Sequence, residues 1–454
     1  MVIAAQRERA RACAYALAVL IALFARVDGA AAAPPAFSDA HGIHVEAVES
    51  LTDRQLNVRV STAALEQAVD VRILLPADYA GDTRAYPVLY LFHGTSGRAS
   101  DWVNAGDAEM ATAELPLIVV MPDCGFNGDG GGWFSDWFNG GAFGQPMWET
   151  FHIAQLIPWV DANLRTVASD AGRAVAGLSQ GGFGSLSYAA RHPDLFTSVA
   201  AFSGGCEIDR DPEAIATSTT IIQFTTGVLS GKDANAIFGP RDLYPLNWRA
   251  HDPATLVTNL RGKDIHLWTG DGMQGPFDPG PPTAPLDQIE VVTFSATRLF
   301  HGHLDDAHIA HTYTYYGAGT HTWPYWARDL REYLPLLMER FAHPPEAPRA
   351  VSYLSADDSW EHWGWSVALQ RDARAFSELH YASRRGFALT GTGVATVVTP
   401  PLYAPDARLR VWMRGRGVRS VSQLRAAADG RLQLAVPLGA GTTPHRTRVS
   451  ILAR

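Results

Sequence analysis

The stretch at residues 173–192, RAVAGLSQGGFGSLSYAARH, constrains the fold of this chain more than any other. Residues 173–177 are mostly small or β-branched and contain no breaker, which predicts a short buried strand. The next turn, Gly177-Leu178-Ser179-Gln180-Gly181, matches the pattern G-x-S-x-G, and an amphipathic run then continues to residue 193. A strand, a tight turn and a helix in this order are the context of a nucleophile elbow at the top of an α/β sheet.

The elbow predicts that Ser179 is a catalytic nucleophile. The glycines on either side of it allow a strained turn to form without a Cβ clash. Ser179 would stand at a helix N-terminus, where the backbone N–H of Gln180 points at an oxyanion formed on an attacked ester. A purely structural turn is the alternative, and the combination of strand, turn and helix argues against it.

Composition describes an ordinary globular protein. The chain has 454 residues, of which 47% are hydrophobic and 18% charged. This length and content predict two domains with ample core. The net charge of −9 gives no reason to expect a nucleic-acid partner.

Residues 1–33 are predicted to be a signal peptide. Three arginines precede an apolar run at residues 12–25, and small residues at 30–33 offer a cleavage site. The apolar run is short for a membrane span, and Arg26 and Asp28 end it, which argues against an uncleaved anchor. We therefore expect a secreted protein, extracellular or in the cell envelope.

The middle of the chain alternates between strands and helices. Residues 44–75 contain alternating apolar runs typical of antiparallel opening strands. Apolar runs suited to buried parallel strands follow at residues 86–92, 117–121, 198–203 and 265–269, with helical segments between them. This order predicts a doubly wound, mostly parallel sheet of the α/β-hydrolase class over residues 40–343.

Chain order suggests further catalytic residues. The small-residue turn after the strand at 86–92 is where such hydrolases place a second oxyanion donor, which here is the amide of Thr95. His321 follows the last predicted strand, where the general base of this fold arrives. Asp271 ends the strand at 265–269 and is an attractive triad acid, because many hydrolases of this fold carry the acid there.

Three features leave alternatives open. Cys124 and Cys206 each follow a predicted strand, and export permits a disulfide between them without establishing one. Residues 211–248 contain an apolar stretch that fits a core helix or a wall of an acyl pocket. Residues 301–311 carry four histidines and two aspartates; the absence of partner ligands at recognisable zinc spacing favours a polar surface loop over a metal site.

The pattern changes after a Pro-rich linker at residues 344–349. Short alternating strands with regularly spaced turns predict a small β-sandwich-like domain over residues 350–454. Trp360, Trp363 and Trp365 are expected to belong to its core.

The predicted C-terminal domain is basic. It holds 14 arginines against 7 acidic residues, a net charge of +7. We therefore expect salt-sensitive attraction to anionic envelope polymer or lipid headgroups. No triad residue is expected in this domain, so a chain ending near residue 343 should keep its activity on soluble esters.

Residues 44–340 resemble the antigen 85 mycolyltransferases and the wider esterase D-type serine hydrolases. The resemblance rests on six strings in the family's order, several of which contain tryptophan and are rare. They are SDWF at 135–138, WETF at 148–151, GLSQGG at 177–182, FGP at 238–240, HDP at 251–253 and GTHTWPYW at 319–326. The resemblance covers neither the predicted signal peptide nor the C-terminal domain.

The resemblance implies an assignment for the triad acid. In the family a glutamate opens a helix about one strand and one loop before the histidine, and Glu290 occupies that place here. Asp271 stays as the second candidate. The two positions that bind the trehalose acceptor in the mycolyltransferases hold His93 and Ser96 in this chain. Together with the retained Trp323, these are the candidate substrate-binding residues, and trehalose itself is not supported.

Together these features predict an exported serine acyltransferase or esterase with a Ser-His-Glu triad and an acyl-enzyme intermediate, acting on cell-envelope lipids. Its partners would be an acyl ester donor and an alcohol or sugar acceptor, with no cofactor and no metal. The alternative is a secreted carboxylesterase that uses water as acceptor. A non-catalytic envelope-binding protein is less supported, because nucleophile, base and a plausible acid occur together.

Overall fold

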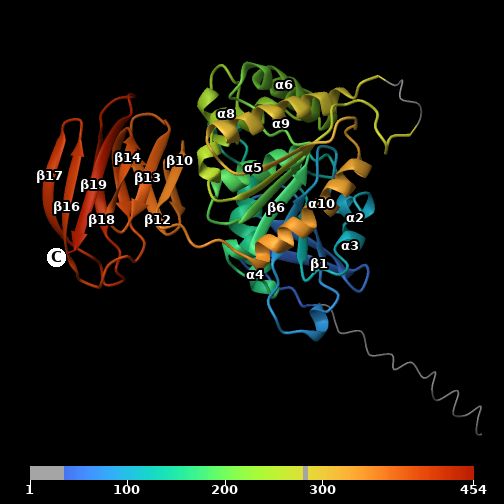
Figure 1. Cartoon of the computed structure of the whole chain (residues 1–454), viewed down its shortest axis with the longest axis horizontal. Helices are drawn as coiled ribbons and strands as arrows, with labels where there is room; N and C mark the ends of the chain where they lie inside the picture. The colour runs from blue at the N-terminus through green and yellow to red at the C-terminus, as the bar shows by residue number, and fades with distance from the viewer. Residues whose placement is uncertain (1–34, 280–284, 454) are drawn as a thin grey trace, which may run out of the picture.

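The computed structural model describes residues 35–279 and 285–453 of the chain. The predicted signal peptide lies outside these residues. Figure 1 shows a body in which helices surround a large sheet and a second body of strands. We call them the α/β region, from β1 (Ile43–Ser50) to α10 (Trp323–Ala342), and the β region, from β10 (Val351–Ser355) to β19 (His445–Ala453). Within the described ranges no helix has both the length and the apolar character that crossing a bilayer requires.

The α/β region is built on a nine-stranded sheet with the order β1-β2-β3-β5-β4-β6-β7-β8-β9. The first three strands pair antiparallel, as does β3 with β5, and every other neighbouring pair is parallel. The prediction of a mostly parallel α/β-hydrolase sheet is therefore confirmed. After β1 the strands are β2 (Gln55–Thr62), β3 (Val69–Leu74), β4 (Val88–Phe92), β5 (Ile118–Pro122), β6 (Arg173–Leu178), β7 (Ser198–Phe202), β8 (Asp264–Thr269) and β9 (Thr312–Tyr315).

Helices cover both faces of this sheet because its central strands are apolar on both sides. In β4, Tyr90 and Phe92 join one buried cluster, while Leu89 and Leu91 join the other. The cluster that contains Leu89 is covered by α2 (Asp101–Asn104), α3 (Ala108–Ala111) and α10. The opposite cluster is covered by α4 (Ile157–Asn163), α5 (Gln180–Arg191) and α9 (Gln288–Asp306).

The remaining helical segments lie in the connections. The π-helical turn η3 (Thr150–Leu156) runs into α4, and a second one, η5 (Gln223–Leu229), continues α6 (Pro212–Ile222). The short helices α7 (Asn235–Phe238) and α8 (Pro245–His251) follow before β8.

The β region consists of two antiparallel sheets around a separate core, which confirms the all-β prediction. A six-stranded sheet has the order β10-β13-β14-β19-β16-β17, and a four-stranded sheet has the order β11-β12-β15-β18. Trp360 and Trp365 are buried in this core, and Trp363 packs against it. The strands between β10 and β19 are β11 (Ser359–His362), β12 (Trp365–Gln370), β13 (Ser377–Ser383), β14 (Gly386–Gly391), β15 (Gly393–Val398), β16 (Arg408–Gly415), β17 (Val418–Arg425) and β18 (Gln433–Gly439).

One local prediction needs correction, and one question that the sequence left open is answered. Helix α9 extends to Asp306, so His301 and His303 lie on a helix and not in a loop; buried Phe300 and Leu304 continue its apolar stripe through the histidines. Cys124 and Cys206 are both free and buried, so they form no disulfide with each other.

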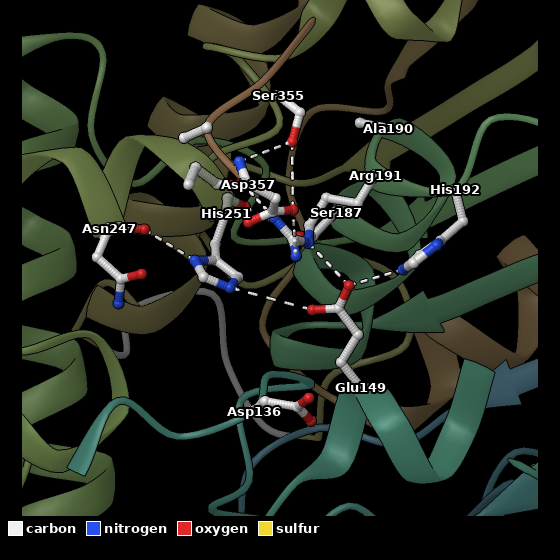
Figure 2. A network of polar contacts seen from close by, with 12 residues as sticks. Asp136, Glu149, Ser187, Ala190, Arg191, His192, Asn247, His251, Ser355 and Asp357 are labelled. Carbon is white, nitrogen blue, oxygen red and sulfur yellow. Dashed lines mark hydrogen bonds and ion pairs between the residues drawn. The ribbon is translucent and has the colours of Figure 1, made fainter. Parts of the chain in front are cut away.

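The two regions meet at the C-terminal end of α5, around a buried ion network (Figure 2). Arg191 Nε donates to Glu149 Oε1 over 2.8 Å, and Arg191 Nη2 lies 3.4 Å from Asp357 Oδ2 of the β region. His192 Nε2 lies 2.6 Å from the same Glu149 oxygen. Burial by itself would raise the pKa of Glu149, but the charge of Arg191 and the hydrogen bond from His192 hold it well below its usual range. The carboxylate is thus kept ionised inside the interface.

Neutral hydrogen bonds extend the interface beyond the ion network. The hydroxyl of Tyr353 donates to the Arg191 carbonyl over 2.7 Å. The buried side chain of Asn259 pairs with the backbone of Leu354 in both directions, at 2.8 and 2.9 Å. Because these groups are buried and mutually satisfied, the β region is held in a defined place against the α/β region.

Candidate active site

Ser179 stands on a sharp turn between β6 and α5. Its backbone has φ 53° and ψ −121°, a left-handed conformation that is costly for a residue with a side chain. Neighbouring glycines make the turn possible: a Cβ on Gly181 would lie 2.4 Å from the carbonyl oxygen of His93, and one on Gly177 would lie 2.5 Å from the Gly181 backbone. The strand–turn–helix geometry is that of a nucleophile elbow.

Ser179 opens onto a cavity of about 430 Å³. The cavity is lined at one end by the predicted site residues Ser179, His321, Thr95, Gln180 and Trp323. Residues from β4, β6 and α10 are thereby brought to one place from three distant parts of the sequence. A largely apolar cavity with a few convergent polar groups is typical of a small-molecule site.

His321 and Glu290 form a short hydrogen bond at the edge of this cavity. His321 Nδ1 lies 2.7 Å from Glu290 Oε2, and the glutamate side chain is fully buried. Glu290 Oε1 accepts hydrogen bonds from the Gly270 amide at 2.7 Å and the Ser203 hydroxyl at 2.9 Å. Burial would raise the pKa of Glu290, but the hydrogen bond and charge of His321 hold it below its usual value. The carboxylate is therefore ionised and fixed, as a group that orients an imidazole needs to be.

Two residues that sequence reasoning missed hold this pair in place. Asp287 caps α9, its Oδ1 accepting from the amides of Ile289 and Glu290, while its Oδ2 accepts from the His321 amide at 2.9 Å. Ser203 bridges the site, since its hydroxyl also accepts from Trp326 Nε1 at 3.2 Å. An aspartate just before an amphipathic helix is a readable N-cap signal; no local signal marks Ser203.

Asp271, the second candidate for the triad acid, does not face His321. Its Oδ2 accepts from the hydroxyl of Tyr315 at 2.9 Å, and its Oδ1 accepts from the Met273 amide at 2.9 Å. The carboxylate of Asp271 is thus bound by Tyr315 and Met273, while Glu290 takes the position beside the imidazole.

Thr95 and Gln180, the predicted oxyanion donors, are linked to each other. Gln180 Nε2 donates to Thr95 Oγ1 over 3.0 Å, and Gln180 Oε1 accepts from the Trp133 amide at 3.2 Å. These bonds fix the loop after β4 against the elbow. Both residues therefore line the cavity next to Ser179 with their backbones held in position.

The three predicted substrate-binding residues differ in their position. Ser96 and Trp323 line the cavity, and Trp323 packs edge-on against Trp102 and Trp326, with 5.3 Å between ring centroids in each pair. His93 is only 1% exposed. Its Nδ1 donates to the Gly94 carbonyl and its Nε2 accepts from the Cys124 amide, at 2.7 and 2.9 Å. Both ring nitrogens hold neighbouring loops, so a contact between His93 and substrate stays a prediction that this geometry does not favour.

Much of the remaining lining of the cavity is apolar and comes from α6, η5, α9 and the segment just before α6. Its lining side chains include Ile208, Ile221, Phe224, Leu229, Ile289, Val292 and Ala296. The segment at 211–248 therefore contributes both to the core and to the pocket wall, since Ala214 and Ile222 of α6 are buried while Ile221 lines the cavity. Such a wall suits the hydrocarbon part of an acyl group.

The histidine-rich end of α9 brings metal-ligating side chains together. Ligand atoms of His301, Asp305 and His311 lie within 4.8 Å of one another. They also contact each other directly, with His301 Nδ1 2.7 Å from His311 Nε2. A second group, which contains His303, is already joined by ion pairs of 3.0 Å to Glu207 and Asp211. The expectation that no metal is bound stays a prediction.

Comparison with known proteins places this site in a family. A model of the Esterase family, described as "Putative esterase", matches residues 62–337. Esterase Rv1288 of Mycobacterium tuberculosis is 34% identical over 279 residues, which are 60% of this chain and 57% of that protein. The chain thus spans less than two thirds of that relative. The diacylglycerol acyltransferase/mycolyltransferase Ag85B of Mycolicibacterium smegmatis is 30% identical over 261 residues, 54% of this chain and 75% of that protein.

A solved structure supports the architecture. The crystal structure of MPT51 (FbpC1) from Mycobacterium tuberculosis superposes with a TM-score of 0.51 and 22% sequence identity. It covers 63% of this chain and 98% of that chain. At this level of identity the likeness shows the fold alone.

Proposed function

This chain belongs to the Esterase family of serine esterases and acyltransferases, and on that premise we propose that Ser179, His321 and Glu290 form its catalytic triad. The observation that carries the proposal is the 2.7 Å contact between His321 and buried, ionised Glu290 at the rim of the cavity that Ser179 lines. A nucleophile, an imidazole and an orienting carboxylate are the three parts that acyl transfer through a serine requires.

The first half-reaction forms an acyl-enzyme. Ser179 Oγ attacks the ester carbonyl, His321 Nε2 takes the hydroxyl proton, and Glu290 stabilises the imidazolium through Nδ1. The imidazolium then gives its proton to the leaving alcohol, and the acyl group stays on Ser179. In the second half-reaction the acceptor hydroxyl loses its proton to His321 and attacks the acyl-enzyme; as the bond to Ser179 Oγ breaks, the imidazolium returns that proton to the serine oxygen.

The backbone amides of Gln180 and Thr95 serve as the oxyanion donors. Both residues line the cavity beside Ser179, and the hydrogen bond between their side chains fixes the two segments relative to each other. A preorganised donor of this kind lowers the barrier by about 3 kcal/mol.

Acyl esters of cell-envelope lipids are the proposed substrates. The apolar wall from α6, η5 and α9 supports a hydrocarbon acyl group, and the Ag85B relative is named as an acyltransferase. Water competes with an alcohol or sugar as acceptor, because His93 and Ser96 replace the acceptor-binding pair of the mycolyltransferases. Product analysis by mass spectrometry, with a long-chain acyl donor and a panel of sugars and glycerol, tests which acceptor is used. If every acceptor yields only free acid, the protein is a hydrolase and not an acyltransferase.

Labelling by a fluorophosphonate and turnover of a p-nitrophenyl ester test the nucleophile. The wild type is expected to label once and to turn over, and Ser179→Ala is expected to do neither. Ser420→Ala, which changes an exposed serine of the β region, is the matched control and should behave as the wild type. Undiminished labelling of a folded Ser179→Ala protein would refute the assignment.

Export and domain division belong to the same proposal. The charged and apolar pattern of residues 1–33 supports cleavage by a signal peptidase, and residues 344–349 would separate a catalytic domain (40–343) from an accessory domain (350–454). N-terminal sequencing of the protein from the culture supernatant tests the first point. A start at Met1 would contradict cleavage.

A further inference from the structure

One face of the β region carries an unusual concentration of arginine. In the six-stranded sheet, Leu409 and Val411 of β16 and Val449 and Ile451 of β19 point into the core. Because side chains alternate along a strand, the residues between them form the outer face. Seven exposed arginines lie on that face in β16, β17 and β19: Arg408, Arg410, Arg414, Arg419, Arg425, Arg446 and Arg448.

The strand register places several of these arginines directly opposite one another. Arg414 pairs with Arg419 of β17 on one side and with Arg448 of β19 on the other, so three guanidinium groups stand in one row. Arg408 and Arg425 form a second such pair. Like charges directly opposite in a sheet lower its stability. A row of this kind therefore costs the fold free energy and needs another explanation than packing.

Ion pairs within the described residues do not neutralise this face, although the charge of Arg446 lowers the pKa of the Glu378 carboxyl against the effect of its burial. Among residues 35–279 and 285–453, none of the seven arginines forms an ion pair with a carboxylate. Three arginines elsewhere in the region, Arg371, Arg374 and Arg431, do pair with a nearby aspartate. The positive charge of the outer face is thus left available to a partner outside the chain.

Apolar side chains stand among the arginines. Val421 and Leu452 are each 56% exposed. Val421 pairs with Trp412 and Leu452 pairs with Arg410, whose guanidinium lies 4.8 Å from the ring centroid of Trp412. A soluble polyanion would offer these groups nothing apolar to contact. Arginines bind phosphate groups well, and aromatic and aliphatic side chains settle at the level of lipid headgroups.

We propose that the outer face of β16, β17 and β19 is a docking surface for an anionic lipid membrane. The surface lies at the edge of the β region away from the α/β region, since β10, at the other edge of the same sheet, makes the interface contacts (Figure 1). Docking there leaves the interface with the α/β region intact and holds the enzyme at a lipid surface. The proposal goes beyond the triad assignment and does not depend on it.

Cosedimentation of the full-length protein with vesicles tests the surface. Vesicles of 30% phosphatidylglycerol in phosphatidylcholine should bind the wild type, and vesicles of phosphatidylcholine alone should not. Because each arginine near such a surface contributes roughly a fivefold increase in affinity, the triple variant Arg414→Gln/Arg419→Gln/Arg448→Gln should bind on the order of 100-fold more weakly. Removing the row of like charges should also raise the melting temperature or leave it unchanged, which reports that the variant is folded.

A matched variant distinguishes the contribution of this face to vesicle binding from that of the protein's overall charge. Arg349→Gln/Arg384→Gln/Arg385→Gln removes the same charge from exposed positions off the face and should keep nearly all of the binding. Equal losses in the two triple variants would overturn the proposal, as would the absence of binding to anionic vesicles. If the protein binds soluble polyphosphate but does not bind anionic vesicles, the partner is an anionic polymer and not a membrane. Ser179→Ala protein should bind vesicles as the wild type does, so a failed triad assignment would not disturb this result.

Discussion

Replacing Glu290 by glutamine tests the triad with almost no change in shape. In the wild type, Oε1 accepts from Gly270 and Ser203 while Oε2 faces His321 Nδ1 at 2.7 Å. The glutamine oxygen can keep the two donors at Oε1, which turns its NH2 group towards His321. An NH2 group cannot accept the Nδ1 proton, so the imidazole proton moves to Nε2, where it blocks proton transfer from Ser179.

The expected cost is large because both effects of the carboxylate are lost together. The wrong tautomer and the missing negative charge lower kcat by about 10⁴-fold in a serine triad. This corresponds to about 5.4 kcal/mol of transition-state stabilisation, at about 1.36 kcal/mol for each factor of ten. Substrate contacts are unchanged, so KM should move little.

Steady-state hydrolysis of a p-nitrophenyl ester measures both constants. Asp271→Asn is the matched control, since it makes the same chemical change at a carboxylate that binds Tyr315 and Met273 instead of His321. It should retain kcat within a few fold. A slow Asp271→Asn beside an active Glu290→Gln would transfer the acid role to Asp271, and full activity in both would remove the carboxylate from the mechanism.

Three further predictions concern stability. A chain ending at His343 should keep turnover of soluble esters but melt several degrees lower, because Asn259 and Arg191 lose their partners Leu354 and Asp357. Calorimetry measures this difference, and an unchanged melting temperature would mean that the interface contributes nothing to stability. Glu149→Gln should destabilise the protein at pH 7 by about 3 kcal/mol or more in urea titrations, because it leaves Arg191 buried with a weakened partner. The pKa of Glu149 is lower in the folded state than in the unfolded state, so its stabilisation is fully present above the unfolded pKa of about 4.3. The difference in unfolding free energy between the wild type and Glu149→Gln should therefore narrow as pH falls below that value. Burial raises the pKa of Asp329 to about 7, so the folded state favours its neutral form and stability should fall as pH rises from about 4 to about 7 and then level off; Asp329→Asn should remove this component, seen as a smaller difference in melting temperature between about pH 5 and pH 8.

The parts of the fold that depend on local pattern were predictable from the sequence. Continuous apolar runs located the central strands such as β4, and period-two alternation located the antiparallel strands of the β region. The elbow at Ser179 was predictable because its glycines, its strand and its helix are neighbours in sequence. The class of the fold followed from the order of these elements.

What the sequence could not predict depends on contacts between distant segments. His93 lies in a loop where a histidine could contact substrate, yet both nitrogens of its ring form hydrogen bonds, one with the Gly94 carbonyl and one with the Cys124 amide. Chain order alone allowed both Glu290 and Asp271 as the triad acid; the family resemblance favoured Glu290, and only the structure shows that its carboxylate lies beside His321. The basic charge of the β region was countable, whereas its concentration on one face appears only once the register of β16 with β17 and β19 is known.

Helix α5 connects the two regions through a single rigid element. Its first turn follows Ser179, and its last residue, Arg191, is the cation of the buried network that receives Asp357 (Figure 2). Twelve residues at a rise of about 1.5 Å each separate the nucleophile from the interface by about 18 Å. The helix is buried along almost its whole length, so a shift of the β region cannot be absorbed by bending at its surface. The β region is therefore held rigidly against the α/β region, so that its arginine-bearing face and the cavity at Ser179 keep one relative position while the enzyme is docked on a membrane.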